Sequence, residues 1–340
     1  MVDYALLVAP SANRVYTAEA PRLTRAELAA FGTVLTRPVT EVADLELGGV
    51  RYIGFRVDDP GLDDRDTAYL SNVSTGYALF RREGGDGELL RPVPLRPLAR
   101  FDDDLITIPK YAGKTNEQFT RLLLNLTVLA GDRAGRMLDT PLTVLDPLCG
   151  RGTTLSQALM YGYHAIGIEI DGKDVDAYVA FLRAWLKRKR IKHRADLHPV
   201  RRDRRQVARC FEATIAGEQH LAVYHADTVD ARQFLRAGIA DAVVADLPYG
   251  VAHGSRAGGE LSRRPLDLLR AAVPVWAELL RPGGALGISW NVHVAARDDA
   301  AKILEGSGLV VVDEPGYRDL AHWVDQAITR DILVARKPVR

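Results

Sequence analysis

The sequence predicts an open α/β sheet preceded by a smaller α+β domain. Short apolar runs alternate with helical patterns after residue 140, as is typical of buried parallel strands; these runs are Leu142–Leu145, His164–Ile170, Leu221–Ala226 and Asp241–Ala245. A linker containing Pro92, Pro94 and Pro97 separates this region from the start of the chain. We therefore expect an N-terminal α+β domain over residues 1–100 and an α/β domain over residues 101–340.

The N-terminal region contains signals for both strands and a helix. Leu23–Phe31 has helical spacing, and Gly32 is a plausible stop. Three segments read as strands, and a glycine-rich turn follows the last of them; these are Tyr4–Val8, Val50–Phe55, Gly76–Phe80 and the turn Gly84–Gly87. This mixture predicts a small α+β unit.

An amphipathic helix precedes the α/β region. Phe119, Leu122, Leu123 and Leu126 form its apolar face, which we expect to cover the sheet. Thr115 lies where this helix starts, and we expect it to be close to the bound ligand.

A glycine-containing turn follows the first buried strand. Asp146 closes that strand, and Gly150 and Gly152 permit a tight turn in which the backbone approaches a ligand. We expect Thr153 or Thr154 to cap the following helix. Open α/β sheets bind ligands at the carboxyl ends of their strands. The segment resembles the glycine loop of S-adenosylmethionine (SAM) methyltransferases.

Acidic residues follow the second and third strands. Glu169 and Asp171 lie about 20 residues beyond the glycine loop, where a carboxylate accepts hydrogen bonds from ribose hydroxyls. They share one face of a strand, so position alone does not choose between them. We expect Asp171 to cap the helix after it. Asp227 closes the third strand, either as a turn residue or as a ligand contact.

The fourth strand delivers Asp246-Leu247-Pro248-Tyr249. This segment resembles the D-P-P-Y signature of enzymes that methylate exocyclic nitrogens of nucleobases. Such a nitrogen is a poor nucleophile because its lone pair is conjugated with the ring. We expect the Asp246 carboxylate and the Leu247 carbonyl to hold its hydrogens, Pro248 to fix the backbone, and Tyr249 to stack on the base. Because only a carbonyl is required at position 247, proline is expected to be tolerated there.

From Lys114 onward the chain resembles the tRNA guanosine-N2 methyltransferase family. The likeness rests on the helix that ends in Leu-Asn, Asp146–Thr154, Gly167–Asp171 and Asp246–Gly250. It implies a Rossmann-like seven-stranded mixed sheet with a reversed last strand, SAM as methyl donor, and RNA, with tRNA expected, as substrate. It also implies that Glu169 holds the ribose and Asp227 the adenine. The expected cofactor-binding residues are Thr115, Asp146, Leu148, Gly150, Gly152, Thr153, Glu169 and Asp227.

Two other functions stay open. A DNA methyltransferase acting on adenine N6 or cytosine N4 shares every catalytic motif, although the motif order and the absence of a long insert after Tyr249 favour RNA. A non-catalytic RNA-binding protein on the same scaffold is the second alternative, and the intact glycine loop, Glu169, Asp246 and Tyr249 argue against it.

Basic residues are concentrated between the second and third strands. Such a cluster neutralises phosphates in nucleic-acid-binding proteins, whereas the alternative is a solvated surface. The residues expected to contact nucleic acid are Lys187, Arg188, Lys189, Arg190, Arg201 and Arg202.

Composition bounds the remaining possibilities. Hydrophobic residues make up 47% and charged residues 26% of the 340-residue chain, as in ordinary globular proteins. No run approaches the ~18 apolar residues of a membrane span, and no signal-peptide pattern is present. The two cysteines, Cys149 and Cys210, make no disulfide framework, and no metal-ligand spacing is evident. We expect a cytoplasmic protein with no metal and no membrane partner, whose oligomeric state the sequence leaves open.

Overall fold

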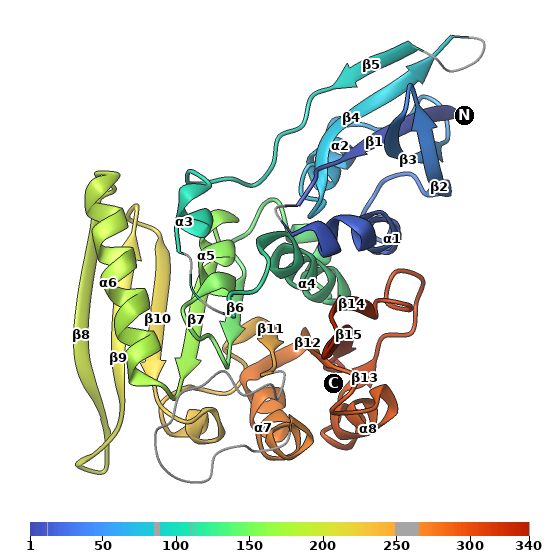
Figure 1. Ribbon diagram of the computed structural model, residues 1–340. Helices are drawn as coiled ribbons and strands as arrows, with labels where there is room; N and C mark the ends of the chain where they lie inside the picture. The colour runs from blue at the N-terminus through green and yellow to red at the C-terminus, as the bar shows by residue number, and fades with distance from the viewer. Residues whose placement is uncertain (12, 85–88, 110, 112, 249–264, 340) are drawn as a thin grey trace.

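The chain builds two β-sheets connected through a layer of helices (Figure 1). The computed structural model describes residues 1–11, 13–84, 89–109, 111, 113–248 and 265–339. The first sheet comes from the N-terminal segment and the second from the remainder, which agrees with the α/β fold and the smaller N-terminal α+β region that the sequence predicts. The division at residue 100 into two domains stays a prediction.

The N-terminal sheet has the order β2-β3-β1-β4-β5, and all its pairings are antiparallel. Its strands are β1 (Val2–Val8), β2 (Val39–Leu47), β3 (Val50–Val57), β4 (Gly76–Glu83) and β5 (Leu89–Val93), with helices α1 (Arg14–Phe31) and α2 (Asp64–Leu70). Pro92 lies in β5 and not in the linker, opposite Phe80. Proline is tolerated there because β5 is an edge strand.

Helix α1 begins well before the apolar pattern that predicts it. The Asn13 side chain accepts hydrogen bonds from the backbone nitrogens of Val15 and Tyr16 and so caps the helix at its start. The helix ends at Phe31 with Gly32 as its C-cap, as predicted.

The large sheet contains the predicted seven-stranded mixed core. Its order is β10-β7-β6-β11-β12-β15-β13, and β15 runs antiparallel to β12. The strands are β6 (Thr143–Asp146), β7 (His164–Glu169), β10 (Gln219–His225), β11 (Ala240–Asp246), β12 (Leu280–Asn291), β13 (Val310–Val311) and β15 (Ile328–Arg336), with β14 (His322–Asp325) paired to β15. The reversed strand confirms the fold class that the motifs imply.

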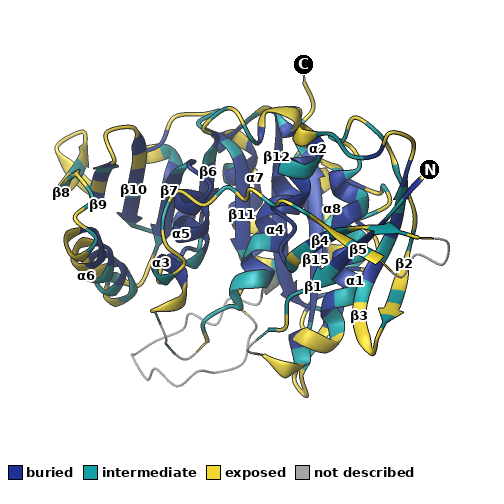
Figure 2. Ribbon diagram, turned by 90° about the horizontal axis from the view of Figure 1, so that it is seen from above, coloured by how far each residue is buried: buried dark blue, intermediate teal, exposed yellow. Residues whose placement is uncertain are grey.

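A hairpin of two long strands extends this sheet beyond β10. It consists of β8 (His193–Arg202) and β9 (Arg205–Ile215), and β9 pairs antiparallel with β10. The sequence analysis does not predict it, because β8 is an edge strand with largely exposed, charged side chains that blur the alternation of a strand (Figure 2).

Helices cover both faces of the large sheet. One face carries α4 (Glu117–Ala130), α5 (Thr153–Met160) and α6 (Gly172–Arg188), and the other carries the short η2 (Thr228–Gln233), α7 (Pro265–Leu279) and α8 (Arg297–Gly306). The remaining short helices are α3 (Asp104–Thr107) and η1 (Ala134–Arg136). Among the helices of the described residues, none has the length and apolar character needed to cross a bilayer.

A buried carboxyl group joins the N-terminal sheet region to the large one. Glu27 of α1 accepts hydrogen bonds from the backbone and side chain of Ser74 and from the Asn125 amide of α4. Burial raises its pKa from 4.5 to about 7, against the lowering effect of these donors. The carboxyl therefore binds a proton more readily in the folded chain than in the unfolded chain.

Glu27 should make the free energy of unfolding depend on pH. Its pKa is raised in the folded state, so its contribution is complete below pH 4.5 and is lost as pH rises to about 7, by about 3 kcal/mol in all. Urea unfolding between these pH values should show that the free energy of unfolding falls less steeply with pH in Glu27→Gln than in wild type. Glu19→Gln is the control, because Glu19 lies on the same helix but is half-buried and paired with Arg22. Parallel curves for wild type and Glu27→Gln would contradict this assignment.

Candidate active site

Four carboxylates gather along one edge of the large sheet. Asp146, Glu169 and Asp246 are the last residues of β6, β7 and β11, and Asp227 follows β10. These strands are parallel neighbours, so their carboxyl ends meet at the same edge. The topology thus brings together the acidic residues that the sequence analysis singles out.

The glycine turn, residues 147–152, connects the end of β6 to α5 at this edge of the sheet. Gly152 has φ 76° and ψ 30° and serves as the N-cap of α5. A Cβ at Gly152 would lie 2.4 Å from the Tyr178 ring, so both conformation and space require glycine. No side chain caps α5, and the predicted cap at Thr153 or Thr154 is wrong. Thr153 instead contacts the Tyr111 hydroxyl at 3.0 Å, and Thr154 hydrogen-bonds Asp146.

Glu169 is hydrogen-bonded to the glycine turn. Its two carboxylate oxygens accept from the backbone nitrogens of Gly150 and Asp171, both at 2.8 Å. Burial raises its pKa. Asp171 caps α6 through Lys173 N, as predicted. Glu169 is therefore the acidic residue that is bonded to the glycine turn, while Asp171 caps α6.

Asp146 experiences the collective charge of the site. It is buried and accepts a hydrogen bond from Leu148 N at 3.1 Å. Burial raises its pKa to about 7, and Asp246 and Glu169 add to the rise. The edge is therefore electronegative, an environment that stabilises a positively charged ligand.

Asp246 is held by two hydroxyl groups. Thr115, just before α4, donates to Oδ2 at 2.5 Å, and Ser289 of β12 donates to Oδ1. Thr115, expected near the cofactor, thus links α4 to the carboxylate assigned to the target.

Leu247 continues the pairing of β11 with β12. Its backbone nitrogen donates to Ser289 O at 2.9 Å, and its side chain is buried in the core. Proline at this position would remove the hydrogen bond, so the structure argues against the expectation that proline is tolerated. Pro248 is exposed, and Tyr249 lies outside the described residues.

Asp227 has a structural role. Its side chain accepts from Val229 N at 3.1 Å and caps η2. The sequence analysis leaves two roles for Asp227, a turn residue or an adenine contact, and the structure shows the turn role.

The predicted basic cluster is divided between opposite edges of the sheet. Helix α6 ends near the start of β8 (Figure 1), and Lys187–Arg190 lie there. Lys189 forms ion pairs with Asp102 and Asp104, both at 2.7 Å. Arg201 and Arg202 lie at the far end of β8, on the carboxyl edge. Only the second group shares an edge with the acidic site.

The hairpin extends past the last pairing of β9 with β10, at Arg209 and His225. Residues 205–208 of β9 continue beyond it, which corresponds to about 13 Å of strand. We call residues 201–208 the basic arm. Its arginines are exposed, and no ion pair among the described residues includes them; they are Arg201, Arg202, Arg204 and Arg205.

Ser289 is a site residue that the sequence does not indicate, and Gly167 is one to which the sequence assigns no separate role. Ser289 is paired with Asp246, but only the strand order places it there. A Cβ at Gly167 would lie 2.6 Å from Leu155 and 2.7 Å from Cys149 Sγ, so glycine allows the turn to pack on β7. A glycine inside a predicted strand is the signal that could have identified it.

Comparisons with known proteins found no matching protein-family model and no matching curated protein. Among solved structures, the chain resembles the N-methyltransferase NodS from Bradyrhizobium japonicum (14% identity, 65% of this chain and 95% of that chain, TM-score 0.40). It also resembles the [4+2]-cyclase SpnF (16%, 66% and 82%, 0.40) and a SAM-dependent methyltransferase from Methanosarcina mazei (12%, 62% and 98%, 0.40). Because these TM-scores lie below 0.5, the functional argument rests on the residues of the site.

Proposed function

We propose that the chain is a SAM-dependent methyltransferase acting on an exocyclic nitrogen of a nucleobase. The observation that carries this proposal is the position of Asp246, hydrogen-bonded by Thr115 and Ser289, at the end of the strand beside the glycine turn. A donor site and an acceptor carboxylate on adjacent strands bring the two reactants together, which is the main requirement of a displacement reaction.

The glycine turn and Glu169 would hold the donor. SAM supplies an electrophilic methyl group on a positively charged sulfur. The electronegative edge formed by Asp146, Glu169 and Asp246 favours that charge, and binding of a cation favours the ionised form of Asp146. Glu169 is the carboxylate assigned to the ribose hydroxyls.

Asp246 and the Leu247 carbonyl would hold the target amine. When these two oxygens accept hydrogen bonds from the amine, the nitrogen lone pair would turn out of conjugation with the ring and toward the methyl group. The new bond joins methyl carbon to nitrogen while the bond from that carbon to sulfur breaks. The sulfur would keep the electron pair of the broken bond and leave as a neutral thioether. Asp246 would stabilise the positive charge that develops on nitrogen and accept the proton that the nitrogen loses.

Structured RNA, with tRNA expected and guanine N2 as the methylated atom, is the proposed substrate. The basic arm supports a nucleic-acid substrate because its exposed arginines lie on the carboxyl edge, where the target base must enter. A base within a helix would need to be flipped out. DNA adenine or cytosine is the second candidate, since Asp246 and the arm suit both polymers.

The position of the transferred methyl group tests the proposal. Incubation of the protein with methyl-labelled SAM and separate RNA and DNA pools, followed by nucleoside digestion, should place label on N2 of guanine from RNA. Label on adenine N6 or cytosine N4 of DNA would select the second candidate. Label on a ring carbon, on a ribose oxygen or on no nucleic acid would contradict the assigned chemistry.

Glu169→Gln should weaken SAM binding by about 1–3 kcal/mol, the scale of a charge-assisted hydrogen bond. The amide keeps the size of the carboxylate but loses its charge and one acceptor. Calorimetry measures the affinity. Asp171→Asn is the matched control, because asparagine also caps a helix and should leave the affinity unchanged. Equal affinities for wild type and Glu169→Gln would mean that another residue binds the ribose.

A further inference from the structure

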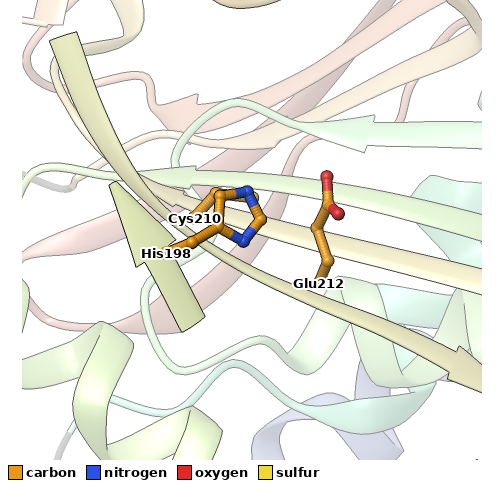
Figure 3. Close-up of side chains that lie close together, drawn as sticks. All are labelled: His198, Cys210 and Glu212. Carbon is orange, nitrogen blue, oxygen red and sulfur yellow. The ribbon is translucent and has the colours of Figure 1, made fainter. Parts of the chain in front are cut away.

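Three potential metal ligands lie together on the hairpin, away from the carboxylates of the active site (Figure 3). His198 of β8 and Cys210 of β9 are directly paired across the hairpin, and Glu212 lies two residues beyond Cys210. Side chains at i and i+2 of a strand share a face, so all three project to one side of the sheet. Their ligand atoms lie within 4.8 Å of one another.

We propose that His198, Cys210 and Glu212 form a zinc site. A thiolate, an imidazole and a carboxylate are all zinc ligands, and three protein ligands leave the fourth tetrahedral position for water. Zinc bonds of about 2.0–2.3 Å place ligand atoms roughly 3.3–3.8 Å apart. Cys210 is fully buried, while His198 and Glu212 are partly or fully exposed, so rotation of the two outer side chains closes the site around the thiolate.

The surroundings of the cluster fit this assignment. Asp196 Oδ2 lies 3.4 Å from His198 Nδ1, which leaves Nε2 of the imidazole for the metal. Carboxylates commonly orient metal-binding histidines in this way. On the other side, Tyr224 pairs with Cys210, shares a hydrogen bond with its thiol, and stacks on Phe234 with ring centroids 4.8 Å apart.

This face of the sheet is open to solvent. The short η2 is the element that follows β10 there, and a cavity of about 540 Å³ lies on the same face, with Asp196, Glu212 and Tyr224 in its lining. Of the three proposed ligands, Glu212 lines this cavity, so an ion would enter from the Glu212 side.

The ion would brace the basic arm. His198 and Cys210 are one residue closer to the core than Arg209, where β9 makes its last pairing with β10. Metal bonds at this level would fasten β8 to β9 directly below the arm. The zinc site does not depend on the proposed methyl transfer, and it has a readout of its own.

Cobalt binding to the metal-free full-length chain tests the site. A thiolate bound to Co²⁺ gives an intense near-ultraviolet charge-transfer band, and Cys149 and Cys210 are the only cysteines of the chain. We expect one equivalent of Co²⁺ to produce the band in wild type and in Cys149→Ser, and one equivalent of Zn²⁺ to abolish it. Cys210→Ser should lack the band. Its persistence in Cys210→Ser, or its absence from wild type, would overturn the proposal.

Variants at the exposed ligands retain the buried thiol and keep the test valid if Cys210→Ser does not fold. His198→Gln and Glu212→Gln should each weaken Co²⁺ binding, and Asp196→Asn should weaken it by roughly 10–100-fold. His193→Gln is the control, because His193 pairs with Ile215 at the other end of the hairpin and should bind no ion with Cys210. Unchanged cobalt affinity in both His198→Gln and Glu212→Gln would overturn the site.

Discussion

Asp246→Asn should reduce the turnover number by at least about 100-fold, the scale seen when a group that stabilises transition-state charge is removed. Asparagine has the same shape, but its amide nitrogen cannot accept a hydrogen from the target amine. The loss should appear in kcat for methyl transfer, while SAM affinity measured by calorimetry should remain close to that of wild type. The reason is that the proposed function assigns Asp246 to the target amine and Glu169 to the donor.

Removal of one hydroxyl that donates to Asp246 should have a smaller effect than replacement of Asp246 itself. Thr115→Val removes the 2.5 Å hydrogen bond to Oδ2 but leaves the carboxylate and Ser289 in place. One hydrogen bond contributes about 1 kcal/mol, so turnover should fall by roughly fivefold, far less than in Asp246→Asn. Rates that are equal in Asp246→Asn and wild type would remove Asp246 from the chemistry. A parallel loss of SAM binding would place it in the donor site.

Replacement of the four arginines of the basic arm by alanine should flatten the salt dependence of RNA binding. Each phosphate contact contributes about 0.7–0.9 to the slope of log K against log salt, so the slope should fall by about 3. The affected residues are Arg201, Arg202, Arg204 and Arg205. Filter binding or fluorescence anisotropy at several salt concentrations measures the slope.

The matched control replaces Lys187, Arg188, Lys189 and Arg190 by alanine, which removes the same formal charge from the opposite edge of the sheet. Lys189 already pairs with Asp102 and Asp104, and Arg188 lies 3.6 Å from Asp104, so this variant should change the slope by less than about 1. Equal slopes for the two variants would mean that net charge, and not the arm, attracts RNA.

The acidic edge could be predicted from the sequence because its residues follow strands whose apolar runs are local signals. Asp146, Glu169 and Asp246 each end such a run, and parallel strands place their carboxyl ends together. The predicted threonine cap of α5 is wrong because Gly152, in the left-handed conformation, occupies the cap position. The Tyr178 ring packs against Gly152, and this contact between distant segments has no local sequence signal. The sequence predicts Pro92 in the linker, because proline fits a strand only at the edge of a sheet and the sequence does not give the strand order.

By itself, the sequence determined the α/β fold, the glycine turn and the acidic residues at the strand ends, because these depend on local periodicity and backbone conformation. Only the tertiary structure decided what lies beside them. Strand order sets Ser289 against Asp246, and antiparallel pairing joins His198 to Cys210. Strand β8 crosses the sheet between the two groups of basic residues and so places them at opposite edges. Contacts of this kind arise between segments distant in the chain, whose relative position depends on packing and not on neighbouring residues.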